Sequence, residues 1–292
     1  MHSHVLATLC YRVRNNIMPS SEPALRKIAA EKLALVSTGG SDWLDGSGEM
    51  TKAEGGFRFI GRKIFGSGAP AGDLLLTMGV YQDPESGPTV KHFAVNMHDP
   101  GVTVLEDWDT LGMRGTGSNT IQINDVFIPE AGISLSRPQG TWHKFFDIIA
   151  PIALPMVMSV YLGIAESARD IALEQARKRQ EDAMVQDQVG AMDNELLIVQ
   201  CSVAEMVRLA SEDNPPTVEQ SNLIARHKTN ATNAAIRTVE KSLAVAGGQA
   251  YFRGLGLERR FRDIQAARYH PIQEPRQHRF SGQIALGLDP VA

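Results

Sequence analysis

The sequence predicts an α+β fold of several domains, with helical segments at both ends of the chain and a strand-rich middle. Apolar residues recur at helical spacing near the start and again, over longer stretches, beyond residue 144. Between residues 33 and 135, short β-rich runs alternate with Gly, Asp, Asn and Pro. We therefore expect a short helical segment at 1–32, a β domain at 33–135 and a helical bundle at 136–292.

Two helices are expected before the first strand. Residues 4–13 carry apolar side chains at helical spacing, and residues 15–21 then interrupt the pattern with Asn, Pro and Ser. Residues 22–32 resume it, with Pro23 in a first turn, where proline is well tolerated.

Six strands are expected in the middle of the chain, at 33–37, 56–65, 74–81, 90–97, 102–108 and 120–128. Their number and regular punctuation by turn residues predict an antiparallel barrel or sandwich. The alternation between apolar and polar residues at 57–62 is imperfect, so it does not assign the two faces of that strand.

The last part of the chain predicts a four-helix-type bundle, because its apolar patterns are long enough for helices that pack side by side. The expected helices span 145–179, 194–210, 217–246 and 257–269. Pro151 and Pro155 are expected to mark a helix start or a kink. Gly247-Gly248 is expected to end the third helix, since glycine is favoured at helix C-termini.

Composition excludes several classes of protein. A net charge of −4 argues against a nucleic-acid binder, which needs a basic face to neutralise phosphates. Cys10 and Cys201 stand far apart, so we expect neither a disulfide framework nor a metal site. No apolar run reaches the ~20 residues that cross a bilayer, and the start shows no secretory signal. We therefore expect a cytoplasmic protein.

Three motifs in the middle of the chain resemble one known family. Residues 108–118 read WDTLGMRGTGS and residues 126–129 read VFIP, which is similar to the middle domain of acyl-CoA dehydrogenases. Residues 37–42, STGGSD, stand where that family has a Gly-rich turn, and residues 63–68, KIFGSG, resemble the strand behind its flavin. The resemblance runs from about residue 4 to 290 and implies the acyl-CoA dehydrogenase fold, with partial N-terminal helices because the chain starts partway into the family's first domain.

The resemblance implies a flavin site, and each of its parts suits that cofactor. A turn rich in Gly and Ser exposes backbone N–H groups and hydroxyl donors to the ring system, and a phenylalanine can stack on it. An arginine on the long helix and the Gly-Gly pair would hold the pyrophosphate and adenosine of a flavin in a neighbouring subunit. This implies a dimer or homotetramer and favours FAD, with FMN as the alternative. The cofactor-binding candidates are Ser37, Thr38, Gly39, Ser41, Phe65, Ser67, Arg179, Gly247 and Gly248.

The chain departs from the family at its catalytic base. Most acyl-CoA dehydrogenases remove an α-proton with a Glu after the last helix, and the matching position here is Pro271. A subgroup places this Glu on the long helix, where this chain has Ala153. Neither residue can accept a proton. Glu274 lies nearby, but the following Pro275 makes it a weak substitute.

The residues Tyr269-His270-Pro271 resemble instead the monooxygenase branch of the same superfamily, in which a His helps to hold a flavin hydroperoxide. Imidazole suits that role, because it donates a hydrogen bond and exchanges protons near neutral pH. His270 is therefore the first catalytic candidate, followed by His4 and His2 on the first helix. The structural alternatives are a capping or interface residue for His270 and frayed terminal residues for His2 and His4.

The leading hypothesis is thus a flavin-dependent oxidoreductase, with monooxygenase chemistry fed by a separate flavin reductase. The alternative is an FAD-dependent acyl-CoA dehydrogenase with another base, which passes electrons to an electron-transfer flavoprotein. A truncated relative without catalytic activity is the second alternative. The sequence does not identify the small-molecule substrate.

Overall fold

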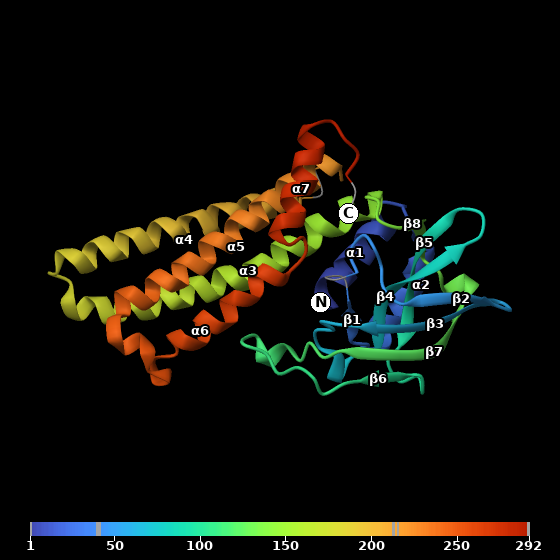
Figure 1. The fold of residues 1–292 in the computed structure, drawn as a ribbon, viewed down its shortest axis with the longest axis horizontal. Helices are drawn as coiled ribbons and strands as arrows, with labels where there is room; N and C mark the ends of the chain where they lie inside the picture. Colours follow the sequence, from blue (N-terminus) through green and yellow to red (C-terminus); the bar gives the residue numbers. More distant parts are fainter. Residues whose placement is uncertain (1, 39–41, 212–213, 215, 291–292) are drawn as a thin grey trace. The chain divides into compact units, whose positions relative to one another are not determined.

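A computed structural model describes residues 2–38, 42–211, 214 and 216–290 of the chain (Figure 1). The chain divides into two compact units. The first, called the sheet unit here, comprises Met1–Asp109, Arg114–His143 and Gly287–Ala292. The second, the bundle unit, comprises Thr110–Met113 and Lys144–Leu286. The three-domain division expected from the sequence stays a prediction.

The sheet unit begins with the two expected helices, α1 (His2–Arg14) and α2 (Glu22–Glu31). The helix α2 ends at Lys32, whose backbone turns left-handed at φ 54°. Val5 of α1, Ile28 of α2 and Leu35 form one small apolar core, which attaches both helices to the first strand. The apolar stripe of each helix thus has its partner within the sheet unit.

Eight strands form one mixed sheet in the order β6-β7-β3-β2-β4-β5-β8, with β1 beside β4. They are β1 (Leu35–Ser37), β2 (Glu49–Ala53), β3 (Gly56–Lys63), β4 (Leu74–Asp83), β5 (Gly87–Asn96), β6 (Val102–Val104), β7 (Ile121–Pro129) and β8 (Leu135–Pro138). All six expected strands are present. The sequence patterns missed β2, whose five residues bury only one side chain, and β8, which is four residues long and contains two polar residues and a proline.

The expectation of a purely antiparallel sheet is wrong at two pairings. The strands β1 and β4 run parallel, as do the short paired parts of β2 and β4. Two parallel strands require a long connection between them. The alternation of apolar and polar residues within one strand does not reveal whether its partner runs parallel or antiparallel. The ring centroids of Phe59 on β3 and Phe93 on β5 lie 4.9 Å apart, although the strands β2 and β4 lie between β3 and β5 in the sheet. The sheet therefore curls around a core of aromatic and aliphatic side chains.

The inward face of β3 ends on a charged residue. Phe57, Phe59, Gly61 and Lys63 all point inward, while the residues between them are exposed. Lys63 is fully buried and its Nζ lies 2.7 Å from Oδ2 of Asp42, which is 1% exposed. The amine also donates to the carbonyl oxygens of Ser47 and Met78, at 2.7 and 2.6 Å. Burial lowers the pKa of Lys63, and the charge of Asp42 partly opposes this effect.

The bundle unit contains α3 (Lys144–Ala176), α4 (Ala183–Leu209), α5 (Val218–Ala246), α6 (Leu257–Ile264) and α7 (Glu274–Ala285). The helices α3, α4 and α5 pack side by side (Figure 1). Alanines at three- and four-residue spacing are fully buried on both α3 and α5, and such small side chains let helices approach closely. Within the described residues, the segment Lys144–Arg179 alone is long and apolar enough to cross a membrane, a test that the core helix of a soluble protein also passes.

The bundle unit departs from the sequence expectation at α4 and α7. The helix α3 starts at Lys144, one residue before the expected start, so of the two roles expected for Pro151 and Pro155 the helix start is wrong and the kink stays a prediction. The helix α4 begins at Ala183 because the side chain of Asp182 accepts a hydrogen bond from the Met184 backbone and caps the helix. The helix α7 was not expected, since its sequence is mostly polar and only Gln277 and Phe280 are buried.

The buried ion pair of the sheet unit allows a stability prediction. Replacing Lys63 with Met leaves the Asp42 carboxylate buried without its cation, so we expect a loss of about 3–5 kcal/mol in the free energy of unfolding. Denaturation in urea measures this loss. The control Lys52→Met, at a lysine whose partner Glu130 is solvent-exposed, should change the free energy by less than about 1 kcal/mol. A double variant, Lys63→Met with Asp42→Asn, should recover part of the loss, and equal stability of Lys63→Met and the control would contradict the prediction.

Candidate functional site

The sheet unit joins the two segments that the sequence nominates for flavin binding. Asp42 is the last residue of the candidate segment 37–42, and Lys63 is the last residue of β3, two positions before Phe65. Their ion pair therefore holds the end of that segment beside the end of the strand. Of the candidates in the segment, Gly39 and Ser41 lie outside the described residues.

Phe65 has an unusual backbone conformation. Its φ is 58°, in the left-handed region that costs a non-glycine residue about 1–3 kcal/mol. Its side chain is 47% exposed, and its ring meets Trp108 at a centroid distance of 6.0 Å and an interplanar angle of 84°. A large apolar ring that is kept exposed at such a cost is suited to stack on a planar ligand. This placement is compatible with the ring-stacking role expected for Phe65, which stays a prediction.

A short chain of hydroxyl groups lies next to Phe65. Ser67 Oγ is 2.7 Å from Ser118 Oγ, which is in turn 2.7 Å from Thr116 Oγ1. Backbone hydrogen bonds from Gly66 and Gly68 fix this segment against residues 116–119. A hydroxyl in such a chain can donate to or accept from a polar ligand by rotating its proton.

Ser37 and Thr38 occupy a more enclosed position than Ser67. Both are buried, and Thr38 Oγ1 lies 3.0 Å from Thr77 Oγ1 on β4. The Thr38 hydroxyl is therefore engaged by one hydrogen bond within the sheet unit, as donor or as acceptor, and has two hydrogen-bonding positions left. Their cofactor-binding roles stay predictions.

The bundle unit brings Arg179 and the Gly-Gly pair together. Nη2 of Arg179 donates to the carbonyl oxygen of Val245 at 2.8 Å, and the Arg179 side chain is exposed. Gly247 ends α5 at φ 65° and ψ −149°, a conformation in which a side chain would be strained. A Cβ added there would lie 3.7 Å from Nη2 of Arg179. Arg179 thus complements the C-terminal end of α5 and still carries N–H groups that could bind an anion.

The catalytic candidate His270 follows α6 and lies in the bundle unit. It is half-buried, and its ring meets that of Tyr161 on α3 at a centroid distance of 5.5 Å and an interplanar angle of 65°. Burial, with a further contribution from the charge of Lys228, lowers the pKa of His270 to about 4. The imidazole is therefore neutral at pH 7, with one nitrogen able to donate and the other able to accept.

His2 and His4 belong to the sheet unit and are not frayed. Nδ1 of His2 accepts a hydrogen bond from the Leu35 backbone at 3.1 Å, which attaches α1 to β1. His4 is 7% exposed, and burial lowers its pKa to about 4. The structural alternative proposed for these two residues therefore fails, while their catalytic role stays a prediction.

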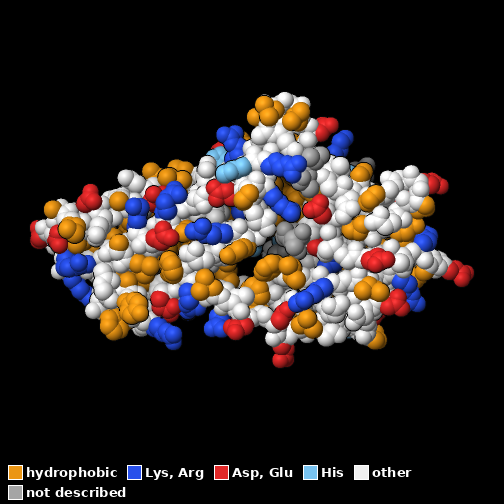
Figure 2. All heavy atoms as spheres, viewed as in Figure 1, with side chains coloured by type: hydrophobic (Ala, Val, Ile, Leu, Met, Phe, Trp, Pro, Cys, Tyr) orange, Lys and Arg blue, Asp and Glu red, His pale blue; other side chains and the backbone are white. Residues whose placement is uncertain are grey.

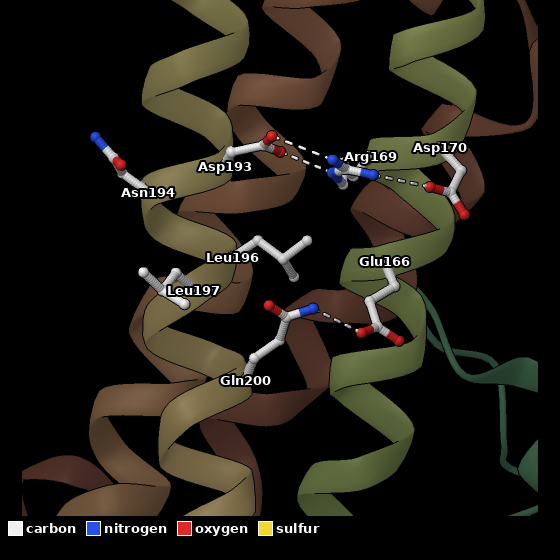
Figure 3. A pocket seen from close by; sticks show the side chains of 8 residues that line it. All are labelled: Glu166, Arg169, Asp170, Asp193, Asn194, Leu196, Leu197 and Gln200. Carbon is white, nitrogen blue, oxygen red and sulfur yellow. Dashed lines mark hydrogen bonds and ion pairs between the residues drawn. The ribbon is translucent and has the colours of Figure 1, made fainter.

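A pocket of about 540 Å³ in the bundle unit lies elsewhere, between α3 and α4 (Figure 3). Arg169 binds both oxygens of Asp193, and Gln200 donates to Glu166. These polar side chains of the pocket thus bind one another, and none of the predicted site residues lines the pocket. Among the described residues, no group of three His, Cys, Asp or Glu side chains could hold a metal ion. On the face drawn in Figure 2, basic and acidic side chains are interspersed.

Sequence reasoning missed two residues next to His270. Tyr161 lies in the apolar part of α3, yet its hydroxyl is buried and has no partner among the described residues. Lys228 is 2% exposed and donates to the turn that contains His270. A signal for Lys228 was present, because it is the one charged residue among the small and apolar residues buried on α5, such as Ile224 and Ala231.

Comparisons with curated proteins place this arrangement among flavin enzymes and their relatives. A putative acyl-CoA dehydrogenase, YdbM of Bacillus subtilis, is 27% identical over 75% of this chain and 58% of its own length. A dibenzothiophene monooxygenase of Mycolicibacterium goodii is 29% identical over 76% of this chain and 59% of its own length. The chain therefore spans less than two thirds of both relatives.

Solved structures agree with the fold. KijD3, solved in complex with FMN and a dTDP-linked amino sugar, is 25% identical and covers 97% of this chain and 73% of its own, with a TM-score of 0.82. Methanesulfinate monooxygenase MsuC from Pseudomonas fluorescens, at 22% identity, covers 98% of this chain and 77% of its own, with a TM-score of 0.81. At that identity the second likeness concerns the fold alone.

Two family models match the chain in sequence order. The acyl-CoA dehydrogenase middle domain matches residues 37–126, which contain most of the strands and the Phe65 segment. The acyl-CoA dehydrogenase C-terminal domain matches residues 156–275, which contain Arg179, Gly247 and His270. With both models matched and the same fold in solved relatives, the chain belongs to the acyl-CoA dehydrogenase family.

Proposed function

We propose that the protein is a flavin-dependent oxidoreductase of monooxygenase type, which uses reduced flavin and molecular oxygen to oxygenate a small organic substrate. One observation carries the proposal: a neutral imidazole, His270, adjoins the position where most acyl-CoA dehydrogenases are expected to have their Glu. That position holds Pro271, and the second known position holds Ala153. α-Proton abstraction from an acyl thioester would lack its acceptor at both places.

The names of similar proteins support the same chemistry. They include dibenzothiophene monooxygenases, a pigment production hydroxylase and amino sugar nitrososynthases. These substrates differ widely, so they support the reaction type and leave the substrate of this chain open. We propose dibenzothiophene and indole as the first probe substrates, since one relative acts on the former and a related structure holds the latter.

The described residues fit a flavin. The exposed ring of Phe65, the hydroxyl of Ser67 and the segment after β1 would hold the isoalloxazine, while Arg179 and Gly247 of a neighbouring subunit would hold the second phosphate. When bound, the reduced flavin supplies the electrons that activate oxygen. The role of His270 is to hold a proton near the reacting oxygen and to exchange it, because a neutral imidazole both donates and accepts. His2 and His4, which belong to the sheet unit, remain additional catalytic candidates.

We also propose that the protein assembles as an oligomer and works with a partner protein. Flavin binding is completed by Arg179 and Gly247-Gly248 of a neighbouring subunit in a homotetramer. FAD is preferred over FMN because those residues would bind its second phosphate and its adenosine. A separate reductase supplies the reduced flavin to this cytoplasmic protein.

The second candidate is FAD-dependent acyl-CoA dehydrogenation, with electrons passed to an electron-transfer flavoprotein. The similarity to YdbM favours it. The described carboxylate nearest in sequence to the expected base is Glu274, at the start of α7. Its Oε1 accepts a hydrogen bond from Asn233 at 3.1 Å and lies 3.6 Å from Nε2 of His278. This carboxylate is thus engaged by neighbouring side chains, which weakens the dehydrogenase reading.

The first test compares oxidised and reduced flavin. The purified protein is titrated anaerobically with oxidised FAD and then with reduced FAD and reduced FMN, and binding is measured by calorimetry. We expect tighter binding of the reduced forms, because a monooxygenase receives its flavin already reduced. Tight retention of oxidised FAD through purification, with its bleaching by an acyl thioester, would establish the dehydrogenase alternative instead.

The second test removes the imidazole. His270→Ala should bind reduced FAD as the parent does but form about 10²-fold less oxygenated probe, with the consumed oxygen released as hydrogen peroxide. The control is His278→Ala, a 64% exposed histidine on α7. Oxygen consumption and product are measured together, and an unchanged ratio in His270→Ala removes the support for this mechanism.

The third test concerns the phosphate end of the cofactor. Arg179→Met should weaken FAD about tenfold to a hundredfold, because one charge-assisted contact is lost, and should leave FMN affinity nearly unchanged. Lys178→Met is the matched control, since that neighbouring exposed lysine contacts only Gln175 among the described residues. Equal losses for FAD and FMN would show that Arg179 serves the fold of α5 alone.

A further inference from the structure

The turn that carries His270 is held by a buried lysine. Lys228 lies on α5 and is 2% exposed. Its Nζ donates to the carbonyl oxygen of His270 at 3.0 Å and to that of Ile272 at 3.2 Å. Pro271, between these two carbonyls, has no N–H group with which to fix the turn.

Among the described residues, no carboxylate forms an ion pair with Lys228. Burial lowers the pKa of Lys228 to about 8, and the more distant charge of Glu274 opposes this effect. A buried cation without an ion-pair partner is costly, so the two carbonyl dipoles provide much of its compensation. Lys228 is thus buried at a position where it binds the backbone on both sides of Pro271.

A second helix contacts the same histidine from α3. The Tyr161 ring packs against the His270 ring, and the Tyr161 hydroxyl is buried without a partner among the described residues. Burial and the nearby charge of Asp263 raise the pKa of Tyr161, so its hydroxyl stays protonated. The charged and titratable side chains near the turn include Lys228 on α5, Tyr161 on α3, Asp263 on α6 and Glu274 on α7, with Arg268 beside Lys228 and His278 beside Glu274.

We propose that Lys228 is the positioning residue for His270: through the carbonyl oxygens of His270 and Ile272 it fixes the turn so that the imidazole is held against Tyr161. This inference rests on the proposed role of His270 in the oxygenation reaction. The lysine acts through the backbone and through its charge, and it does not itself contact the substrate.

The ammonium group of Lys228 is proposed to have two effects on His270. Its hydrogen bonds limit the positions that the His270 ring can adopt, and misplacement of a catalytic group by about 1 Å can cost about 10²-fold in rate. Its positive charge also helps to keep His270 neutral, because a nearby cation disfavours a second one. Loss of the ammonium group should therefore raise the pKa of His270 and loosen its ring.

The test uses Lys228→Met, which keeps an unbranched side chain one atom shorter and removes both donors and charge. Lys228→Arg restores them, and the pocket of about 160 Å³ that borders residue 228 leaves room for the larger group. Lys241→Met, at a half-buried lysine on the same helix, is the matched control. The purified full-length variants are compared by thermal unfolding, and all further measurements are made well below the lowest unfolding temperature.

The first readout is the NMR titration of the His270 imidazole, whose signal is identified by its loss in His270→Ala. In Lys228→Met we expect an upward shift of the His270 pKa from about 4, and a return toward the parent value in Lys228→Arg. The control Lys241→Met should titrate as the parent does. A His270 signal and pKa in Lys228→Met identical to those of the parent would overturn the proposal.

The second readout is the yield of oxygenated probe per oxygen consumed. Lys228→Met should lose about tenfold to a hundredfold of this yield with its affinity for reduced FAD unchanged, and Lys228→Arg should recover most of it. A purely structural role would lower only the unfolding temperature, and that result would also overturn the proposal. If His270→Ala leaves the yield unchanged, the proposed function fails, while the NMR titration still decides whether Lys228 positions His270.

Discussion

The buried ion pair between Asp42 and Lys63 is the contact on which the candidate cofactor site depends. It joins the segment after β1 to the end of β3, two segments separated by more than twenty residues in the chain. A buried charge pair is expensive to desolvate and contributes little net stability compared with apolar residues of the same size. We expect the pair to contribute specificity, because separating the two segments would leave both charges buried without a partner. Phe65 and the hydroxyl chain of Ser67 begin immediately beyond this fixed point.

A comparable arrangement recurs in the bundle unit around Lys228. There the cation has no ion-pair partner among the described residues and is held by two carbonyl oxygens, one on either side of Pro271. In both units a lysine occupies a position that the apolar pattern of its strand or helix would assign to a hydrophobic residue. Each lysine fixes a segment of irregular backbone that regular secondary structure cannot hold. The candidate cofactor segment of the sheet unit and the His270 turn of the bundle unit are thus each held by a buried lysine.

The proposed chemistry follows from what the turn after α6 contains. A proline replaces the expected carboxylate, so the group that removes a proton from a thioester is absent from its place. A neutral imidazole stands next to it, with a pKa too low for protonation at pH 7. A group of this kind can exchange protons with bound oxygen species without introducing a fixed charge. Membership of the acyl-CoA dehydrogenase family therefore describes the fold, and the side chains of this turn carry the proposal on the reaction.

The sequence by itself determined the order of helical and strand-rich segments, the six longer-patterned strands and the family, because hydrophobic periodicity and short motifs are local properties. It also named Phe65, Arg179, Gly247 and His270. Only the tertiary structure decided that β1 and β4 run parallel, that Asp42 meets Lys63, that Arg179 reaches the end of α5, and that Tyr161 and Lys228 surround His270. Each of these contacts joins residues far apart in the chain. Such pairings depend on how the elements pack, and no single segment of sequence encodes them.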